Sequence, residues 1–151
     1  MLFRSEYMAT HHTDLAAVII EPVLGEGGYV PAPAACLQAV ERLCNQYGVL
    51  FILDEIQTGF GRTGQWFAHQ HYGVDPDVIT LAKGMGSGMP IGAMAAKASV
   101  MAKWETGAHG GTYCGNPVCA AAARATLSVV EPLIPTVNAL AHRAMAVLND
   151  R

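Results

Sequence analysis

Two side chains of opposite charge, Asp54 and Lys83, each follow a run of apolar residues and lie 29 positions apart in the sequence. If the two runs are neighbouring parallel strands, the carboxylate and the amine meet at one edge of a sheet. A primary amine placed there can capture an aldehyde as an imine, and a carboxylate opposite it can keep a ring nitrogen protonated. The pair therefore predicts covalent chemistry on a pyridinium aldehyde.

The surroundings of these two residues fit that chemistry. Lys83 lies between the apolar run 78–82 and the glycine-rich run 84–88, so we expect partial desolvation that favours the neutral, nucleophilic amine. Gln57, three residues after Asp54, has an amide that can donate to a phenolic oxygen on the same ring. The plainer alternatives are a turn cap for Asp54 and a polar loop residue for Gln57.

The spacing of apolar residues predicts alternating strands and helices around these side chains. The predicted strands cover 17–21, 49–53, 78–82 and 91–96, of which the last three are expected to be buried, and the predicted helices cover 33–47, 65–72, 116–131 and 137–149. Pro132 and Pro135 are expected to separate the last two helices. This order predicts an α/β fold with a mostly parallel sheet flanked by helices. Glu21 and the loop that carries Glu26 follow the first strand at the same edge.

Composition excludes several classes of function. The 151-residue chain is 52% hydrophobic and 14% charged, which is enough to bury the core of one domain. Its net charge of −3, with no basic run, argues against nucleic-acid and anionic-membrane partners. Continuous apolar runs stay well below the roughly 18 residues of a membrane span, and the first residues lack the apolar segment of a secretory signal. We expect a cytoplasmic protein without a membrane partner.

Cysteines and histidines predict no metal site. The cysteines at 36, 44, 114 and 119 match no zinc-ligand spacing, and we expect buried free thiols. The neighbouring histidines 11 and 12, and 69 and 71, lack a third ligand at a useful spacing. They are expected to be solvated or core histidines.

Gly59–Gly64 offers a rival function. It reads Gly-Phe-Gly-Arg-Thr-Gly and matches the G-x-G-x-x-G pattern of a dinucleotide-binding turn. Its first glycine lies six residues past the last apolar residue of the strand rather than directly after it, and this spacing makes a dinucleotide site the weaker hypothesis.

Thr112 offers a phosphate contact. It lies in a glycine-rich segment just ahead of the helix that Asn116 and Pro117 are expected to begin. A hydroxyl and free backbone N–H groups at such a place suit a phosphate. The alternative is an ordinary loop that leads to a helix cap.

Four ordered segments carry these residues, namely 21–28, 53–64, 82–84 and 110–117. Together they closely resemble class III pyridoxal-phosphate aminotransferases, the group that contains 4-aminobutyrate, acetylornithine and ornithine aminotransferases. The resemblance covers residues 16–131 and implies part of the large domain of fold-type I pyridoxal-phosphate transferases. Residues 1–15 are then an irregular N-terminal stretch, and residues 132–151 a C-terminal helix that leads toward a small domain.

The resemblance also implies roles for single residues. Lys83 would form the Schiff base with pyridoxal 5'-phosphate, Asp54 would pair with the pyridine nitrogen, and Gln57 would reach the phenolic oxygen. Ile56 would pack on the ring. Thr112 would bind the cofactor phosphate of the partner subunit in a homodimer.

Two further implications concern the substrate pocket and the reaction. Glu26 matches a position near the substrate pocket, while Glu21 matches an acidic position whose role stays open. The implied reaction is ping-pong transfer of an amino group from an amine or amino acid to a 2-oxo acid, with Lys83 moving the proton.

Length qualifies this expectation. The chain is much shorter than a full member of the family, so we expect poor activity from the chain alone. Three alternatives stay open: a decarboxylase or an aminomutase that uses the same lysine and acid, or a non-catalytic fragment that pairs with full-length subunits.

Overall fold

The computed structural model describes residues 2–150. At its centre is a four-stranded sheet in the order β1 (Ala17–Ile20), β4 (Leu50–Asp54), β5 (Val78–Leu81) and β6 (Ala93–Ala96). The first three strands are parallel, and β6 runs antiparallel to β5. The predicted α/β fold with a mostly parallel sheet is therefore confirmed. The prediction that residues 91–96 form a buried strand is wrong, because β6 is an edge strand and is largely exposed.

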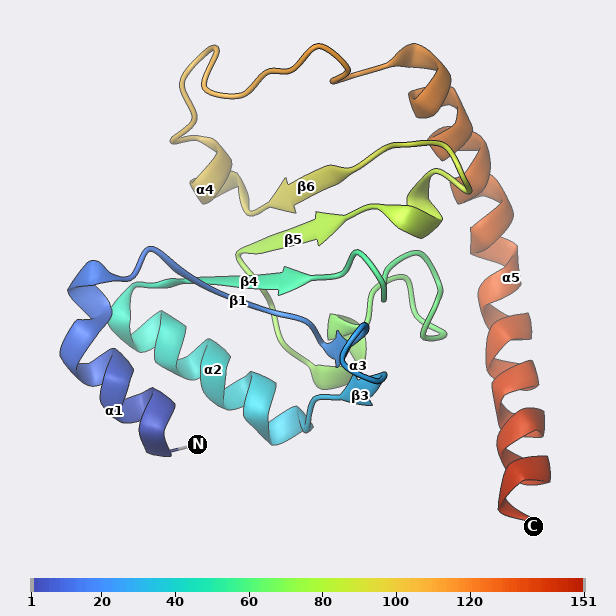
Figure 1. Ribbon diagram of the computed structural model, residues 1–151, viewed down its shortest axis with the longest axis horizontal. Helices are drawn as coiled ribbons and strands as arrows, with labels where there is room; N and C mark the ends of the chain where they lie inside the picture. Colours follow the sequence, from blue (N-terminus) through green and yellow to red (C-terminus); the bar gives the residue numbers. More distant parts are fainter. Residues whose placement is uncertain (1, 151) are drawn as a thin grey trace.

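One helix packs against this sheet and shares its core. α2 (Ala34–Tyr47) packs against β4 (Figure 1) and ends at Gly48, whose left-handed φ of 67° suits a helix C-terminus. Its buried positions recur at helical spacing, as the sequence predicts. The core that the two elements share includes Leu37, Val40, Cys44, Phe51 and Leu53.

The N-terminal stretch has more structure than the sequence predicts. Residues 1–15 were expected to be irregular, but α1 (Leu2–His11) and the 3-10 turn η1 (His12–Asp14) lie there. Met8 is buried in the core cluster, and α1 contacts α2. The apolar pattern of residues 2–11 is weak, and the packing of Met8 against the core stabilises the helix in its place.

Short elements connect the strands. β2 (Val23–Leu24) and β3 (Val30–Pro31) form a separate two-stranded sheet, and α3 (His69–Tyr72) is shorter than the predicted helix 65–72 but ends at Gly73 as expected. The 3-10 turn η2 (Lys83–Met85) follows β5, and α4 (Ala98–Met101) follows β6.

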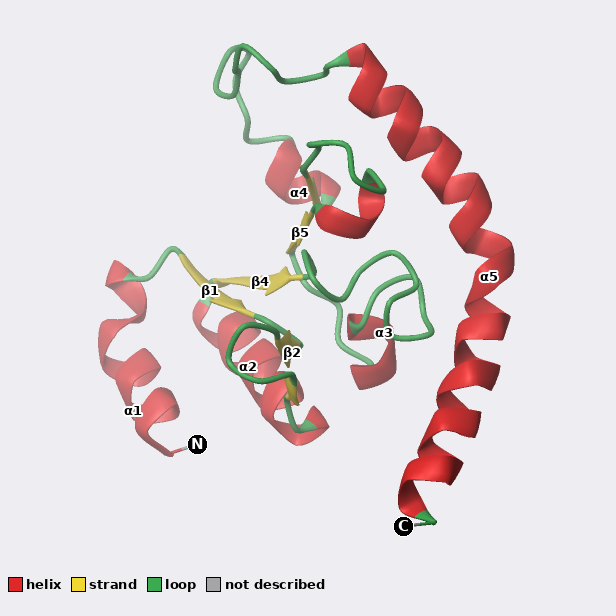
Figure 2. Ribbon diagram, turned by 45° about the vertical axis from the view of Figure 1, so that its right-hand side comes forward, coloured by secondary structure: helices red, strands yellow, loops and turns green. Residues whose placement is uncertain are grey.

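α5 (Pro117–Asn149) is one helix where the sequence predicts two. Asn116 caps it by accepting hydrogen bonds from the backbone N–H of Val118 at 3.0 Å and of Cys119 at 3.2 Å. Pro132 and Pro135 lie inside it, and the helix bends along its length instead of breaking (Figure 2). The predicted break is therefore wrong. α5 passes the ends of β4 and β5 toward which their arrows point (Figure 1).

α5 also meets the length and composition of a membrane span. Its most apolar window has a mean hydropathy of 1.3, and 11% of that window is buried. No other helix within residues 2–150 meets this criterion. The sequence expectation considered only uninterrupted apolar runs and therefore did not single out this helix. Helices in the cores of soluble proteins meet the same criterion, so it does not assign a membrane.

All four cysteines are free thiols, as predicted. Cys44 and Cys119 are buried, whereas Cys36 is half-buried and Cys114 is exposed, so the expectation of burial is wrong for the last two. Within residues 2–150, no group of three or more potential ligands could hold a metal ion.

Candidate functional site

Asp54 ends β4 at the edge of the sheet where the predicted chemistry requires it. It lies opposite Thr80 in the register between β4 and β5, and its Oδ1 accepts a hydrogen bond from the backbone N–H of Ile56 at 3.0 Å. This bond closes a tight turn directly after the strand. The turn cap, weighed as an alternative for Asp54, is thus present. It occupies one carboxylate oxygen, so it is compatible with a second role for the other.

Lys83 begins η2, two residues after β5 ends. Its Nζ donates a hydrogen bond to Oε1 of Gln57. Lys83 and Gln57 are therefore brought together, and Asp54 lies at the end of the neighbouring strand. The expected desolvation is not found, because Lys83 is exposed.

The loop after β1 reaches the same edge. Oε2 of Glu21 accepts a hydrogen bond from the backbone N–H of Gly25 at 2.9 Å. A Cβ at Gly25 would lie 3.5 Å from Cγ of Gln57, so the loop and the Gln57 side chain are neighbours. Glu21 thus holds a loop beside Gln57, which is a role that sequence reasoning left open. Glu26, the next residue, is exposed.

Thr112 is not brought to Lys83. It is exposed and lines a different pocket, together with Ile91 and Cys119. Ile56 is half-buried and lines neither pocket that contains Lys83. Their predicted contacts with a cofactor remain predictions.

The Gly59–Gly64 loop is explained by helix packing. A Cβ at Gly61 would lie 3.2 Å from Cγ1 of Val130, and one at Gly64 would lie 1.9 Å from Oδ1 of Asn138. Asn138 also donates from Nδ2 to the carbonyl oxygen of Gly64 at 2.9 Å. These glycines let α5 approach the loop. They do not open a helix, since α3 begins only at His69, and the hypothesis of a dinucleotide-binding turn is therefore wrong.

Glu55 is a buried residue that sequence reasoning missed. Its side chain is completely buried, and Oε2 accepts hydrogen bonds from the hydroxyl of Thr58 and, at 2.9 Å, from the backbone N–H of Ala68. Its Oε1 is 2.8 Å from the backbone nitrogen of His69 and 3.1 Å from Nδ1 of the same residue. The loop that carries Gln57 is thus fastened at both ends. An acid directly after a buried strand was the only signal in the sequence.

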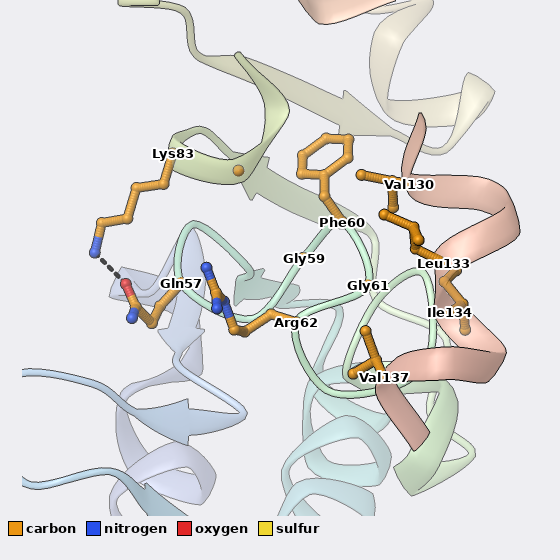
Figure 3. Close-up of a pocket in the computed structure, with 11 residues that line it drawn as sticks. Gln57, Gly59, Phe60, Gly61, Arg62, Lys83, Val130, Leu133, Ile134 and Val137 are labelled. Atoms are coloured by element: carbon orange, nitrogen blue, oxygen red, sulfur yellow. Dashed lines mark hydrogen bonds between the residues drawn. The ribbon is translucent and has the colours of Figure 1, made fainter. Parts of the chain in front are cut away.

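Lys83 and Gln57 lie on one side of a pocket of about 260 Å³ (Figure 3). The loop supplies Gly59, Phe60, Gly61 and Arg62, and η2 supplies Gly84. The opposite wall is apolar and comes from α5, through Val130, Leu133, Ile134 and Val137. Arg62 lines this pocket as well, and the sequence analysis assigned it no role.

Comparison with known proteins gives one consistent result. The family model described as aminotransferase class-III matches residues 3–151. The chain is 57% identical over 119 residues to the acetylornithine aminotransferase of Corynebacterium efficiens, which covers 79% of this chain and 30% of that relative. It is 53% identical over 115 residues to the succinylornithine transaminase of Photorhabdus laumondii, covering 76% of this chain and 29% of the relative. The chain thus spans about a third of the length of the curated relatives it matches.

Solved structures agree with these matches. The acetylornithine aminotransferase of Elizabethkingia anophelis superposes with a TM-score of 0.80 at 38% identity, covering 85% of this chain and 32% of that one. The ornithine δ-aminotransferase of Plasmodium falciparum gives 0.78 at 41% identity, covering 86% and 35%.

Proposed function

Because this chain belongs to the class-III aminotransferase family, we propose that it is the cofactor-binding core of an enzyme that moves an amino group from an amine or amino acid to a 2-oxo acid. Class-III aminotransferases are enzymes that depend on pyridoxal phosphate. The matched relatives are named as aminotransferases and transaminases, which favours transfer over the decarboxylase and aminomutase alternatives.

The three polar side chains at this edge of the sheet suit pyridoxal phosphate. An amine, an amide and a carboxylate, from Lys83, Gln57 and Asp54, are complementary to its aldehyde, phenolic oxygen and ring nitrogen. The hydrogen bond from Lys83 to Oε1 of Gln57 is the observation that carries the proposal, because it joins two of these groups beside the strand end that carries the third. It also leaves the Nε2 donors of Gln57 available for an oxygen.

Each residue then has a defined task. When bound, pyridoxal phosphate supplies an electron sink for negative charge at the substrate carbon. The free oxygen of Asp54 would hold the proton on the ring nitrogen, Ile56 would pack on the ring, and Gln57 would donate to the phenolic oxygen. Lys83 Nζ would bind the aldehyde carbon and, once free, carry a proton between the substrate carbon and the cofactor carbon.

Other parts of the proposal concern residues farther away. Glu26 would lie near the substrate, on the loop beside Gln57. Thr112, in a separate pocket, would contact the cofactor phosphate of a partner subunit in a homodimer. A cytoplasmic location is supported by four free thiols.

The attachment site is tested by incubating the purified chain with pyridoxal phosphate, reducing with borohydride and mapping the modified peptide. We expect the label on Lys83 and its loss in Lys83→Ala. Lys97 is the matched control: partial burial alone would lower its pKa, but hydrogen bonds and charge from Asp75 and Asp77 outweigh burial and raise the pKa. Its amine therefore stays protonated. A label mainly on Lys97 or Lys103 would overturn the assignment.

Activity is tested separately. We expect the 151-residue chain alone to transfer amino groups poorly, because Thr112 does not reach the pocket of Lys83 within one chain. Transamination and carbon dioxide release are measured with the same amino acid, alone and after mixing with a full-length relative. Efficient transamination by the isolated chain would refute the expected dependence on a partner, and carbon dioxide release would favour a decarboxylase.

Pairing with longer subunits is the second candidate function. It is favoured by the exposed apolar residues of α5, among them Val129 and Leu140 at 59% and 56% exposure. Co-purification with a full-length homologue, without activity of the chain itself, is its expected outcome.

A further inference from the structure

Thr80 is the residue of β5 that lies directly opposite Asp54 in the sheet. Its hydroxyl oxygen is buried, yet it has no hydrogen-bond partner within residues 2–150. A buried hydroxyl without a partner costs free energy, because folding removes it from water and returns no hydrogen bond. Such a group in a native structure calls for an explanation beyond packing.

Thr80 and Asp54 share one face of the sheet. Leu53 and Ile79, which precede them in β4 and β5, belong to the core on the side of α2. Because successive side chains of a strand point to opposite faces, those of Asp54 and Thr80 both point to the other side. The backbone N–H of Glu55 donates to the carbonyl oxygen of Thr80 at 3.0 Å, which fixes the two strands side by side at this point (Figure 1).

Asp54 offers an acceptor within reach of the Thr80 hydroxyl. Its Oδ1 accepts a hydrogen bond from the backbone N–H of Ile56 at 3.0 Å, whereas its Oδ2 accepts none from the described part of the chain. Neighbouring strands lie about 4.8 Å apart, so rotation of the Thr80 side chain about one bond brings its hydroxyl toward this carboxylate.

Packing and the other neighbour of Thr80 do not account for the hydroxyl. Valine has the same shape as threonine and the same preference for strands, so it would fill this position without an unpaired polar atom. On the other side of Thr80 lies Met94 of β6, whose thioether is only a weak acceptor. The carboxylate of Asp54 is therefore the partner that the sheet offers.

We propose that Thr80 is a positioning residue for the cofactor, whose hydroxyl donates a hydrogen bond to Asp54 when that carboxylate pairs with the ring nitrogen. The inference rests on the proposed function, because it takes Asp54 as the partner of the ring nitrogen. Donors from Ile56 and Thr80 would hold the carboxylate in one orientation, as supporting hydrogen bonds do around a binding group. Thr80 acts through Asp54 and does not itself touch the cofactor.

Two valine variants separate this role from a structural one. Thr80→Val keeps the shape of the side chain and removes an unpaired hydroxyl, so the chain without cofactor should unfold at the same urea concentration as the parent or a higher one. Thr63→Val is the matched control, because Thr63 also has a buried hydroxyl without a partner but lies in the Gly59–Gly64 loop. The same result is expected for its unfolding.

Cofactor affinity should change in only one of these two variants. Dissociation constants are measured by absorbance titration of the purified chain with pyridoxal phosphate, and Lys83→Ala gives the baseline for imine formation at other lysines. We expect about tenfold weaker binding in Thr80→Val and the affinity of the parent in Thr63→Val. Thr80→Ser, which keeps the hydroxyl, should restore most of the affinity.

An analogue of pyridoxal phosphate with a C–H group in place of the ring nitrogen tests the route through Asp54. It presents no ring N–H to the carboxylate, so the orientation of that carboxylate no longer matters for binding. Thr80→Val and the parent chain should therefore bind the analogue equally. A general disturbance of the site would weaken the binding of both compounds alike.

Several results would overturn the inference. They are unfolding of Thr80→Val at a lower urea concentration than Thr63→Val, unchanged affinity of Thr80→Val for pyridoxal phosphate, equal weakening in Thr63→Val, and equal weakening for the analogue. Unchanged affinity with borohydride label still on Lys83 would refute the role of Thr80 alone. A parent chain that binds no more cofactor than Lys83→Ala would refute the proposed function as well.

Discussion

Glu55 shows how one residue next to a reactive group can fix the whole loop. Each of its two carboxylate oxygens contacts two hydrogen-bond donors inside the protein. Because the side chain is completely buried, water cannot take the place of any of these four donors. Asp54 precedes Glu55 and Gln57 follows two residues later. The geometry proposed for the cofactor therefore depends on a group that would not touch it.

Glu55→Gln tests this dependence. An amide places an NH2 group where an oxygen accepted two hydrogen bonds, so at least two donors lose their acceptor. We expect a loss of about 2–4 kcal/mol in the free energy of unfolding, measured by urea denaturation. Glu105→Gln, at an exposed position, is the control and should change stability by less than about 0.5 kcal/mol. Equal stability of the two variants would mean that the buried carboxylate is dispensable.

Cys44 gives the fold a pH dependence at the residue scale. Burial, together with the nearby charge of Asp77, raises the pKa of this thiol from 9.0 to about 11. The folded state therefore keeps a proton that the unfolded chain releases above pH 9.0, so this contribution to stability is complete below that pH and is lost as the pH rises to about 11. We expect stability to fall by roughly 2–3 kcal/mol across this range. Cys44→Ala should flatten the decline, and an equally steep decline in that variant would contradict the assignment.

At the scale of elements, the contact between α5 and the Gly59–Gly64 loop holds one wall of the pocket in place. Gly64→Ala would add a Cβ 1.9 Å from Asn138, at a φ of 86°. We expect the free energy of unfolding, measured by thermal or urea denaturation, to fall by about 2–4 kcal/mol. Ligand binding in the pocket between this loop and α5 should also weaken.

Gly73→Ala separates backbone strain from helix packing. Gly73 has a φ of 62°, but a Cβ there would meet nothing within 4 Å. This variant should lose only about 1 kcal/mol and keep ligand binding. If both alanine variants lost the same stability, backbone strain alone would explain the loss in Gly64→Ala. The contact between Gly64 and α5 would then contribute nothing.

The same contact shows what could be predicted from sequence. Apolar strands and helical spacing predicted β4, β5 and α2, and strand order placed Asp54 and Lys83 at one edge. The predicted break at Pro132 is wrong. The backbone hydrogen bonds of neighbouring residues continue the helix through the proline, and the helix bends there instead. The packing of α5 against the glycines of the Gly59–Gly64 loop was not predicted, because the two partners are distant in sequence. Only tertiary packing reveals such pairs.

At the scale of the whole molecule, the sheet has an open edge. Among residues 2–150, β1 pairs with no strand except β4, so its other side offers no strand partner in the described part of the chain. Ile19 in this strand is 60% exposed. Beside it lies an apolar pocket of about 360 Å³ between β1, α1 and α2, lined by residues that include Tyr7, Val18 and Leu43. An exposed apolar edge strand is a template for pairing with another chain. The molecule should therefore associate through β1.

Ile19→Lys tests that association. A charged side chain on an edge strand disfavours pairing with a second strand, so sedimentation velocity at increasing concentration should show this variant as a monomer where the parent chain forms larger species. Val30→Lys is the matched control, because Val30 is 56% exposed but lies in β3, outside the four-stranded sheet. Both variants should keep the circular dichroism of the parent. If Val30→Lys removed the larger species as effectively, general apolar exposure rather than the β1 edge would drive the association.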